Sequence, residues 1–128
     1  MKKRSLILPI LIVCFTIAFS SCKKSLENKI EGIWRRVNVV NVNADIFEDW
    51  SFTGGYLYVL RTTAGSIGYD TLSYGTYTMK VKLFKRYLSI ETSSDPNMIK
   101  QWDIDKLTKK QLVLSTGEGT EYREFTKK

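Results

Sequence analysis

Paired carboxylates are the first residues in this chain whose spacing could do chemistry. Asp103 and Asp105 lie two apart on one face of an expected strand, and Trp102 and Ile104 lie on the opposite face. Glycoside hydrolysis needs two carboxyl groups facing each other across a cleft, about 5–9 Å apart. Two carboxylates side by side on one strand do not predict that arrangement. We therefore expect this face to be a solvated outer surface beside Lys106.

Other catalytic and metal-binding arrangements are also missing from the sequence. The chain has 0 histidines, which removes Ser-His-Asp and Cys-His catalysis and the commonest metal ligand. The acidic residues Glu48 and Asp49 lack the glycine and the late glutamate of a calcium loop. The glycines at 65 and 68, and at 117 and 119, do not lead from a strand into a helix, as phosphate-binding loops do. We expect no enzymatic activity, metal or cofactor.

A cysteine after an apolar segment is the remaining reactive feature. A basic stretch (residues 2–4) precedes an apolar run (residues 6–19), and the small Ser20 and Ser21 come directly before Cys22. The run is shorter than the roughly 20 residues of a membrane-spanning helix. This layout predicts a secretory signal peptide rather than a transmembrane segment.

The same segment resembles the lipobox of bacterial lipoproteins, with Phe19 where that motif more often has leucine. The resemblance implies cleavage before Cys22 and attachment of lipid to its sulfur. More than one acyl chain, such as palmitate, is implied, because one chain alone holds a protein only marginally. Lys23 after the cysteine implies the outer membrane of a bacterial envelope, and the periplasmic and surface faces both stay open. The alternative is an ordinary cleaved signal with an incidental cysteine.

These boundaries divide the chain into three parts. Residues 1–21 are the expected signal peptide, residues 22–30 a lipidated tether with a short helical turn, and residues 31–128 the folded domain. Residues 22–128 number 107, which fits one domain with a single core.

Loss of the three basic residues at 2–4 lowers the formal charge from +7 to +4. The chain has 2 cysteines, so the processed chain would keep Cys22 alone and form no internal disulfide. The chain has no basic run with interleaved aromatic residues, so we do not expect it to bind nucleic acid. We expect a monomer.

Short apolar and aromatic segments, broken by turn residues every 8–12 positions or so, predict an all-β domain beyond Gly32. Trp50 and Phe52 share one strand face, and so do Leu88 and Ile90, as half-buried strands require. No gap is long enough for a helical crossover, so consecutive strands should pair antiparallel. Closing this up-and-down meander into a small barrel would remove its two exposed edges. The eight expected strands are 33–42, 46–52, 56–63, 71–80, 86–92, 98–107, 111–115 and 120–127.

The order of several short motifs resembles lipocalins, and more closely the lipocalin-like domains of bacterial lipoproteins. The chain has Gly32-x-Trp34 at the start of the first strand and Gly75-Thr76-Tyr77 in the fourth. The resemblance covers most of residues 25–127 and implies a lipocalin-like β-barrel of about eight strands. It also implies that Trp34 closes one barrel end beneath an arginine from the last strand, for which Arg123 is the candidate. The other matching segments are 50–52, 102–104, 107–108 and 112–114.

Two functions from different classes remain open. Many large rings in a small domain, together with the resemblance, favour a barrel that binds a small apolar or amphipathic ligand. A packed core, with loops or an exposed face that bind another envelope protein, is the alternative. The candidate ligand-binding residues are Trp50, Phe52, Tyr58, Tyr77, Leu88, Ile90, Trp102 and Ile104.

Overall fold

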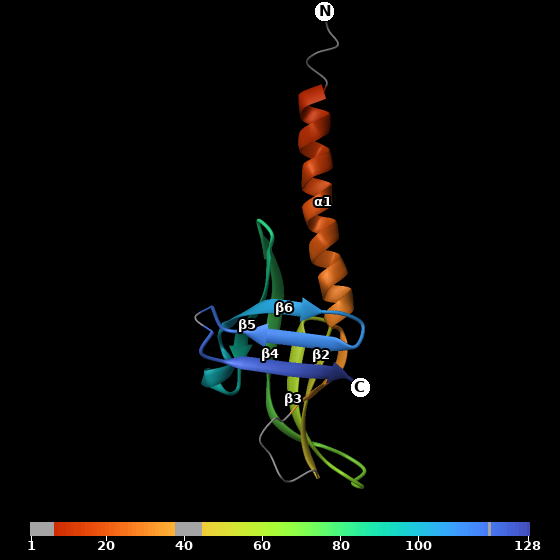
Figure 1. The fold of residues 1–128 in the computed structure, drawn as a ribbon, viewed down its shortest axis with the longest axis vertical. Coiled ribbons are helices and arrows are strands. Elements are labelled where there is room, and N and C mark those ends of the chain that lie inside the picture. Colours follow the sequence, from red (N-terminus) through yellow and green to blue (C-terminus); the bar gives the residue numbers. More distant parts are fainter. Residues whose placement is uncertain (1–6, 38–44, 118) are drawn as a thin grey trace, which may run out of the picture.

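Eight antiparallel strands follow one another in chain order, and β8 pairs with β1 to close a barrel (Figure 1). This confirms the predicted all-β, up-and-down fold. The computed structural model describes residues 7–37, 45–117 and 119–128. The elements are α1 (Ile7–Ile30), β1 (Gly32–Arg36), β2 (Ile46–Thr53), β3 (Tyr56–Thr63), β4 (Asp70–Lys82), β5 (Lys85–Ser93), η1 (Pro96–Met98), β6 (Gln101–Leu107), β7 (Gln111–Ser115) and β8 (Tyr122–Lys127).

The strand boundaries agree with the predicted ones to within two residues, apart from the end of β1 and the start of β6. β1 ends at Arg36 and Val37 is no longer in the strand, while residues 38–42 of the predicted first strand lie outside the described residues. β6 begins at Gln101 rather than Met98, because Asp95 caps a short 3-10 helix by accepting a hydrogen bond from the Asn97 backbone N–H at 3.0 Å. β8 begins at Tyr122 rather than at residue 120.

The last strand, whose inward face the sequence left open, pairs with β7 without a register shift. Phe125 is buried and Tyr122 is exposed. Because side chains alternate along a strand, Arg123 and Lys127 share the inward face with Phe125. Arg123, the arginine of the last strand that the resemblance singled out, thus points into the barrel. Lys127 points the same way.

The helix α1 is much longer than the predicted helical turn. It spans 24 residues and continues through Cys22 to Ile30, so the whole of residues 22–30, and not only a short turn within them, is helical. Leu26 and Ile30 lie four residues apart, one helical turn, and both are buried in the barrel's core cluster. The end of α1 is therefore fixed to one end of the barrel (Figure 1). Within the described residues, no helix combines the length and hydropathy needed to cross a bilayer.

Aromatic side chains fill the middle of the barrel. The rings of Trp50 and Phe125 lie 4.9 Å apart between centroids, and those of Phe52 and Tyr77 lie 5.0 Å apart. Trp102 meets Trp50 edge-on at 6.4 Å. These distances are typical of packed aromatic pairs, so the rings contact one another throughout this layer. The layer separates the end of the barrel at α1 from the opposite end.

Candidate functional site

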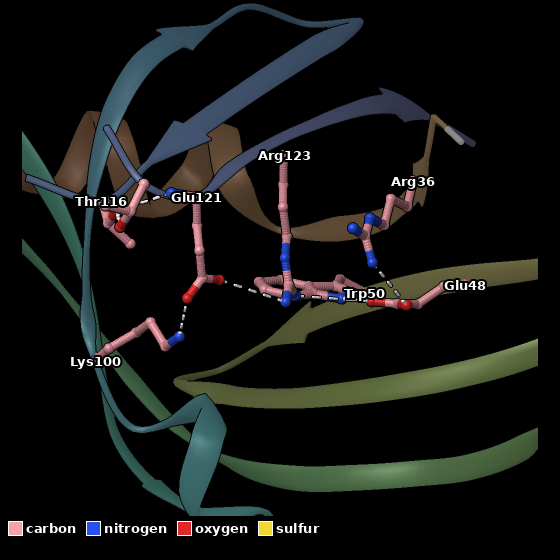
Figure 2. Close-up of polar contacts among 8 residues, drawn as sticks. Arg36, Glu48, Trp50, Lys100, Thr116, Glu121 and Arg123 are labelled. Carbon is pink, nitrogen blue, oxygen red and sulfur yellow. Dashed lines mark hydrogen bonds and ion pairs between the residues drawn. The ribbon is translucent and has the colours of Figure 1, made fainter. Parts of the chain in front are cut away.

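Charged side chains occupy the barrel interior at the end away from α1. On β1, Arg36 lies two residues beyond Trp34, so it points inward but farther from the helix. On β8, Lys127 pairs with Trp34, and Arg123 lies four residues away, about 13 Å along the strand. Figure 2 shows Arg123 extending between Glu121 and Glu48. We call Arg36, Glu48, Lys100, Glu121 and Arg123 the mouth cluster.

Arg123 is the centre of the mouth cluster. Its guanidinium carbon lies 5.3 Å from the ring centroid of Trp50 and 5.1 Å from that of Trp102. Its side chain is 19% exposed, so solvent still reaches it. Burial, with the nearby charge of Arg36, lowers the pKa of Arg123 below its ordinary value. The guanidinium remains charged, because that ordinary value lies far above neutral pH.

Two carboxylates approach Arg123 without forming close hydrogen bonds to it. Glu48 Oε1 lies 3.9 Å from one guanidinium nitrogen, and Glu121 Oε2 lies 3.8 Å from the other. Glu48 is already engaged, since Oε1 accepts from Trp50 Nε1 at 2.8 Å and Oε2 from Arg36 Nη1 at 3.3 Å. Among the described residues, neither carboxylate comes within hydrogen-bond distance of the Arg123 guanidinium. Its planar fork of donors can therefore take a further acceptor.

The other acidic residue of the cluster is held by a lysine. Lys100 Nζ donates to Glu121 Oε1 at 2.7 Å, and that hydrogen bond is the main reason why the pKa of Glu121 lies below its ordinary value. Lys100 also lies 5.3 Å from the ring centroid of Trp102. Both carboxylates of the cluster thus accept hydrogen bonds from their neighbours, while three cations face them. The excess charge at the mouth is positive.

An indole N–H beneath this cluster lacks a partner. Trp102 is fully buried, and its Nε1 has no hydrogen-bond acceptor in the described part of the chain. A buried donor without an acceptor is costly and rare. The other two tryptophans contrast with it, since Trp34 Nε1 donates to the Ile30 carbonyl at 2.7 Å and Trp50 Nε1 to Glu48. Trp102 therefore adds a second unused donor beside Arg123.

At the opposite end, the cation over Trp34 is a lysine and not the arginine that the resemblance implied. Trp34 is buried and closes the end covered by α1. Lys127 Nζ, not Arg123, lies over its ring, 4.5 Å from the centroid, and burial lowers the pKa of this lysine. The reason is register, because Lys127 is the β8 residue paired with Trp34. Gly32, at φ +120°, leaves the space that this lysine occupies, since a Cβ there would lie 2.8 Å from Lys127 Nζ.

Seven of the eight candidate ligand residues lie in the buried core cluster, and Tyr58 does not. Tyr58 is 40% exposed and faces outward, whereas its neighbours Leu57 and Val59 are buried. The seven that lie together are Trp50, Phe52, Tyr77, Leu88, Ile90, Trp102 and Ile104. The two carboxylates at 103 and 105 are not among the buried residues.

The sequence interpretation missed the polar residues that surround the buried rings, although a signal for them existed. Arg36 is two residues from Trp34, Glu48 two from Trp50, and Lys100 two from Trp102. Glu121 is likewise two residues from Arg123. Alternation places such residues on the same inward face. A charge at this spacing from a buried tryptophan predicts the polar end of a barrel interior.

A second charged network lies on the outside of the barrel, around Asp49. Arg35 donates to both carboxylate oxygens, from Nε at 2.9 Å and from Nη2 at 3.1 Å. Thr62 Oγ1 and Lys128 Nζ lie 3.2 and 3.3 Å from Oδ2. This network is fully partnered and resembles a structural ion pair rather than a binding site. In the described ranges, no group of three acidic, cysteine or histidine side chains is placed to hold a metal ion.

Comparison of the chain with protein-family models, with curated proteins and with solved structures found no match in any of the three.

Proposed function

We propose that this barrel binds a small amphipathic molecule with an anionic group at its open end. The observation that carries the proposal is the pair of unused donors there. In the part of the chain that the structure describes, Arg123 lies over two indoles with no carboxylate closer than 3.8 Å, and the buried N–H of Trp102 lacks an acceptor. A carboxylate could accept from both, and charge-assisted hydrogen bonds to arginine are among the strongest in proteins.

The proposal includes a lipid anchor on Cys22, which would place this ligand site in the bacterial envelope. The lipobox-like segment supports the anchor, and so does the exposure of Cys22 on α1. The same proposal includes a relationship of this barrel to lipocalin-like domains. The closed eight-stranded meander with Trp34 at its covered end supports that relationship. The packed aromatic layer favours a short ligand that binds at the mouth over a long chain running through the barrel.

Octanoate is a suitable probe, with octanol as its uncharged counterpart. Trp50 and Trp102 lie beneath the mouth, so tryptophan fluorescence reports binding. Arg123→Met keeps the side-chain length and removes the charge. Hydrogen bonds to charged groups contribute about 1.5–3 kcal/mol, so we expect octanoate to bind at least about 10-fold more weakly. Weak octanol binding should be unchanged.

Lys127→Met is the matched control, because this lysine is also an inward β8 cation over a tryptophan. It lies at the other end of the barrel, and we expect it to leave octanoate binding unaltered. The proposal fails if octanoate does not bind, or if Lys127→Met weakens binding as much as Arg123→Met.

A second candidate function, docking to another envelope protein, is favoured by an aromatic outer face. Tyr58 and Tyr74 are paired across β3 and β4, and Tyr56 follows on the same face. All three tyrosines are exposed. Crosslinking in cells through a photoreactive residue at position 74 would test this candidate, and an absence of crosslinked products would reject it.

A further inference from the structure

The turn between β4 and β5 presents two apolar side chains to solvent. Leu83 is 86% exposed and Phe84 is fully exposed. Large apolar side chains side by side at the tip of a hairpin are unusual on a soluble surface and indicate an interaction site. We propose that this tip inserts into the interfacial region of a lipid bilayer beside the N-terminal anchor.

The backbone of the turn supports selection for an apolar side chain. Leu83 has φ +55°, and it is the only non-glycine residue with positive φ in the described ranges. This region disfavours residues with a bulky side chain, and glycine or asparagine would adopt it at lower cost. Because Leu83 is 86% exposed, its packing returns little stability for this strain. Strain retained at an exposed position points to a function outside the fold.

The residues next to the tip match the chemistry of a membrane surface. Lys82 and Lys85 form the last pair of the β4–β5 ladder, and Arg86 follows. Apolar residues that penetrate the headgroup region, flanked by lysine and arginine that meet anionic headgroups, are typical of interfacial binding. The carboxylates that face this segment are Asp103 and Asp105, which share with Phe84 and Arg86 the rim of a surface groove at the base of the turn. Farther down the hairpin, Lys80 is paired with Glu91 at 3.4 Å.

The position of the tip relative to the helix selects a bilayer over other partners. In Figure 1 the hairpin rises above the barrel on the same side as α1 and extends along the direction of the helix. Cys22 lies one helical turn before Leu26, which is buried against the barrel. Lipid on Cys22 would therefore hold the barrel close to the membrane surface with this side facing it.

The groove beside α1 adds positive charge to that same side. It has a volume of about 620 Å³ and runs between the helix and the turn after β6. Four lysines are among its lining residues, which are Lys24, Ser25, Asn28, Lys29, Lys109 and Lys127. An anionic membrane surface is complementary to this face as a whole. The orientation of the barrel relative to the membrane rests on the proposed anchor, whereas the exposure of the tip does not depend on it.

Quenching by brominated lipids tests the inference on the full chain. Phe84→Trp places a reporter at the tip, and the three native tryptophans are fully buried. The protein, as processed by the cell, is reconstituted in vesicles of phosphatidylethanolamine and phosphatidylglycerol with brominated acyl chains. Wild-type emission is subtracted, and near-ultraviolet circular dichroism verifies the fold. We expect the new tryptophan to shift to shorter wavelength and to be quenched at least twofold.

Ile67→Trp is the matched control, since Ile67 is also fully exposed but lies in the turn before β4, at the other end of that strand. It should remain unquenched. Equal behaviour of the two reporters would overturn the inference. So would a blue shift of the Phe84→Trp emission that depends on protein concentration without vesicles, because a second copy would then cover the tip.

Two further readouts separate this inference from the proposed anchor. The intact mass of the same sample shows whether Cys22 carries lipid. A lipidated protein with an unquenched tip overturns the hairpin contact and leaves the anchor standing, whereas a quenched tip without lipid supports the contact and rejects the anchor. Combining Lys82→Glu and Lys85→Glu should reduce quenching in anionic vesicles, and unchanged quenching would overturn the role given to these lysines.

Discussion

Asn in place of Asp49 should destabilise the barrel in a pH-dependent way. The Asp49 side chain is 1% exposed, and it accepts hydrogen bonds from Arg35, Thr62 and Lys128. Burial raises the pKa of this carboxyl, but the hydrogen bond and charge of Arg35, with the charge of Lys128, outweigh burial and hold it below its ordinary value. Asp49→Asn keeps the volume and removes the charge that Arg35 and Lys128 face.

The magnitude follows from the partners. A hydrogen bond to a charged group contributes about 1.5–3 kcal/mol. Arg35 is 30% exposed and Lys128 47%, so water replaces part of what each loses. We therefore expect the free energy of unfolding at pH 7 to fall by about 2–3 kcal/mol. For a domain of this size, that lowers the Tm by about 10–20 °C.

The pH dependence gives a second readout in urea denaturation. A carboxyl with a lowered pKa stabilises the fold above its unfolded-state pKa, near 3.9, and that stability disappears as the pH falls through the folded value. Wild type and Asp49→Asn should differ fully at pH 7, begin to converge as the pH falls below about 4, and meet only below the folded-state pKa of Asp49. Asp103→Asn is the control and should change stability by less than about 0.5 kcal/mol. A difference that persists in acid, or one within that control range at pH 7, would refute the reasoning.

Two more predictions concern backbone geometry. Gly75→Ala should lower the free energy of unfolding by about 3 kcal/mol or more, because the added Cβ would lie 1.9 Å from the Thr92 carbonyl oxygen. A thermal melt measures this loss of stability. A loss below about 1 kcal/mol would mean that the two strands separate easily at this point. Leu83→Asn should raise the urea midpoint, since asparagine tolerates φ +55° and the leucine is 86% exposed. A lower midpoint would show that Leu83 stabilises the fold after all.

The sequence was sufficient for the fold because period-two alternation is strong in this chain. Trp50 with Phe52, and Leu88 with Ile90, fixed the inward faces, and the structure buries all four. Register was harder, because two inward cations of β8 could each lie over Trp34. Only the pairing of Trp34 with Lys127 decides between them, and that pairing depends on where β1 begins.

The polar part of the site could be predicted only in outline. Each charged residue of the mouth cluster lies two positions from a residue that points inward, so its direction is readable from the sequence. Its place along the barrel axis is not, because Arg123 and Lys127 have equal spacing to inward neighbours and lie at opposite ends. The length of α1 was also underestimated, since Leu26 and Ile30 gave a helical signal for a single turn.

The indole N–H resonances test the central claim most directly. The three tryptophans give three signals in a ¹⁵N–¹H spectrum, and each indole has a different environment: Trp34 donates to Ile30, Trp50 to Glu48, and Trp102 to nothing described. On addition of octanoate, we expect the Trp102 signal to move downfield in a saturable way as its N–H gains an acceptor, while Trp34, at the far end, stays in place. A Trp102 signal that does not move at any octanoate concentration would contradict a binding site at the mouth of the barrel.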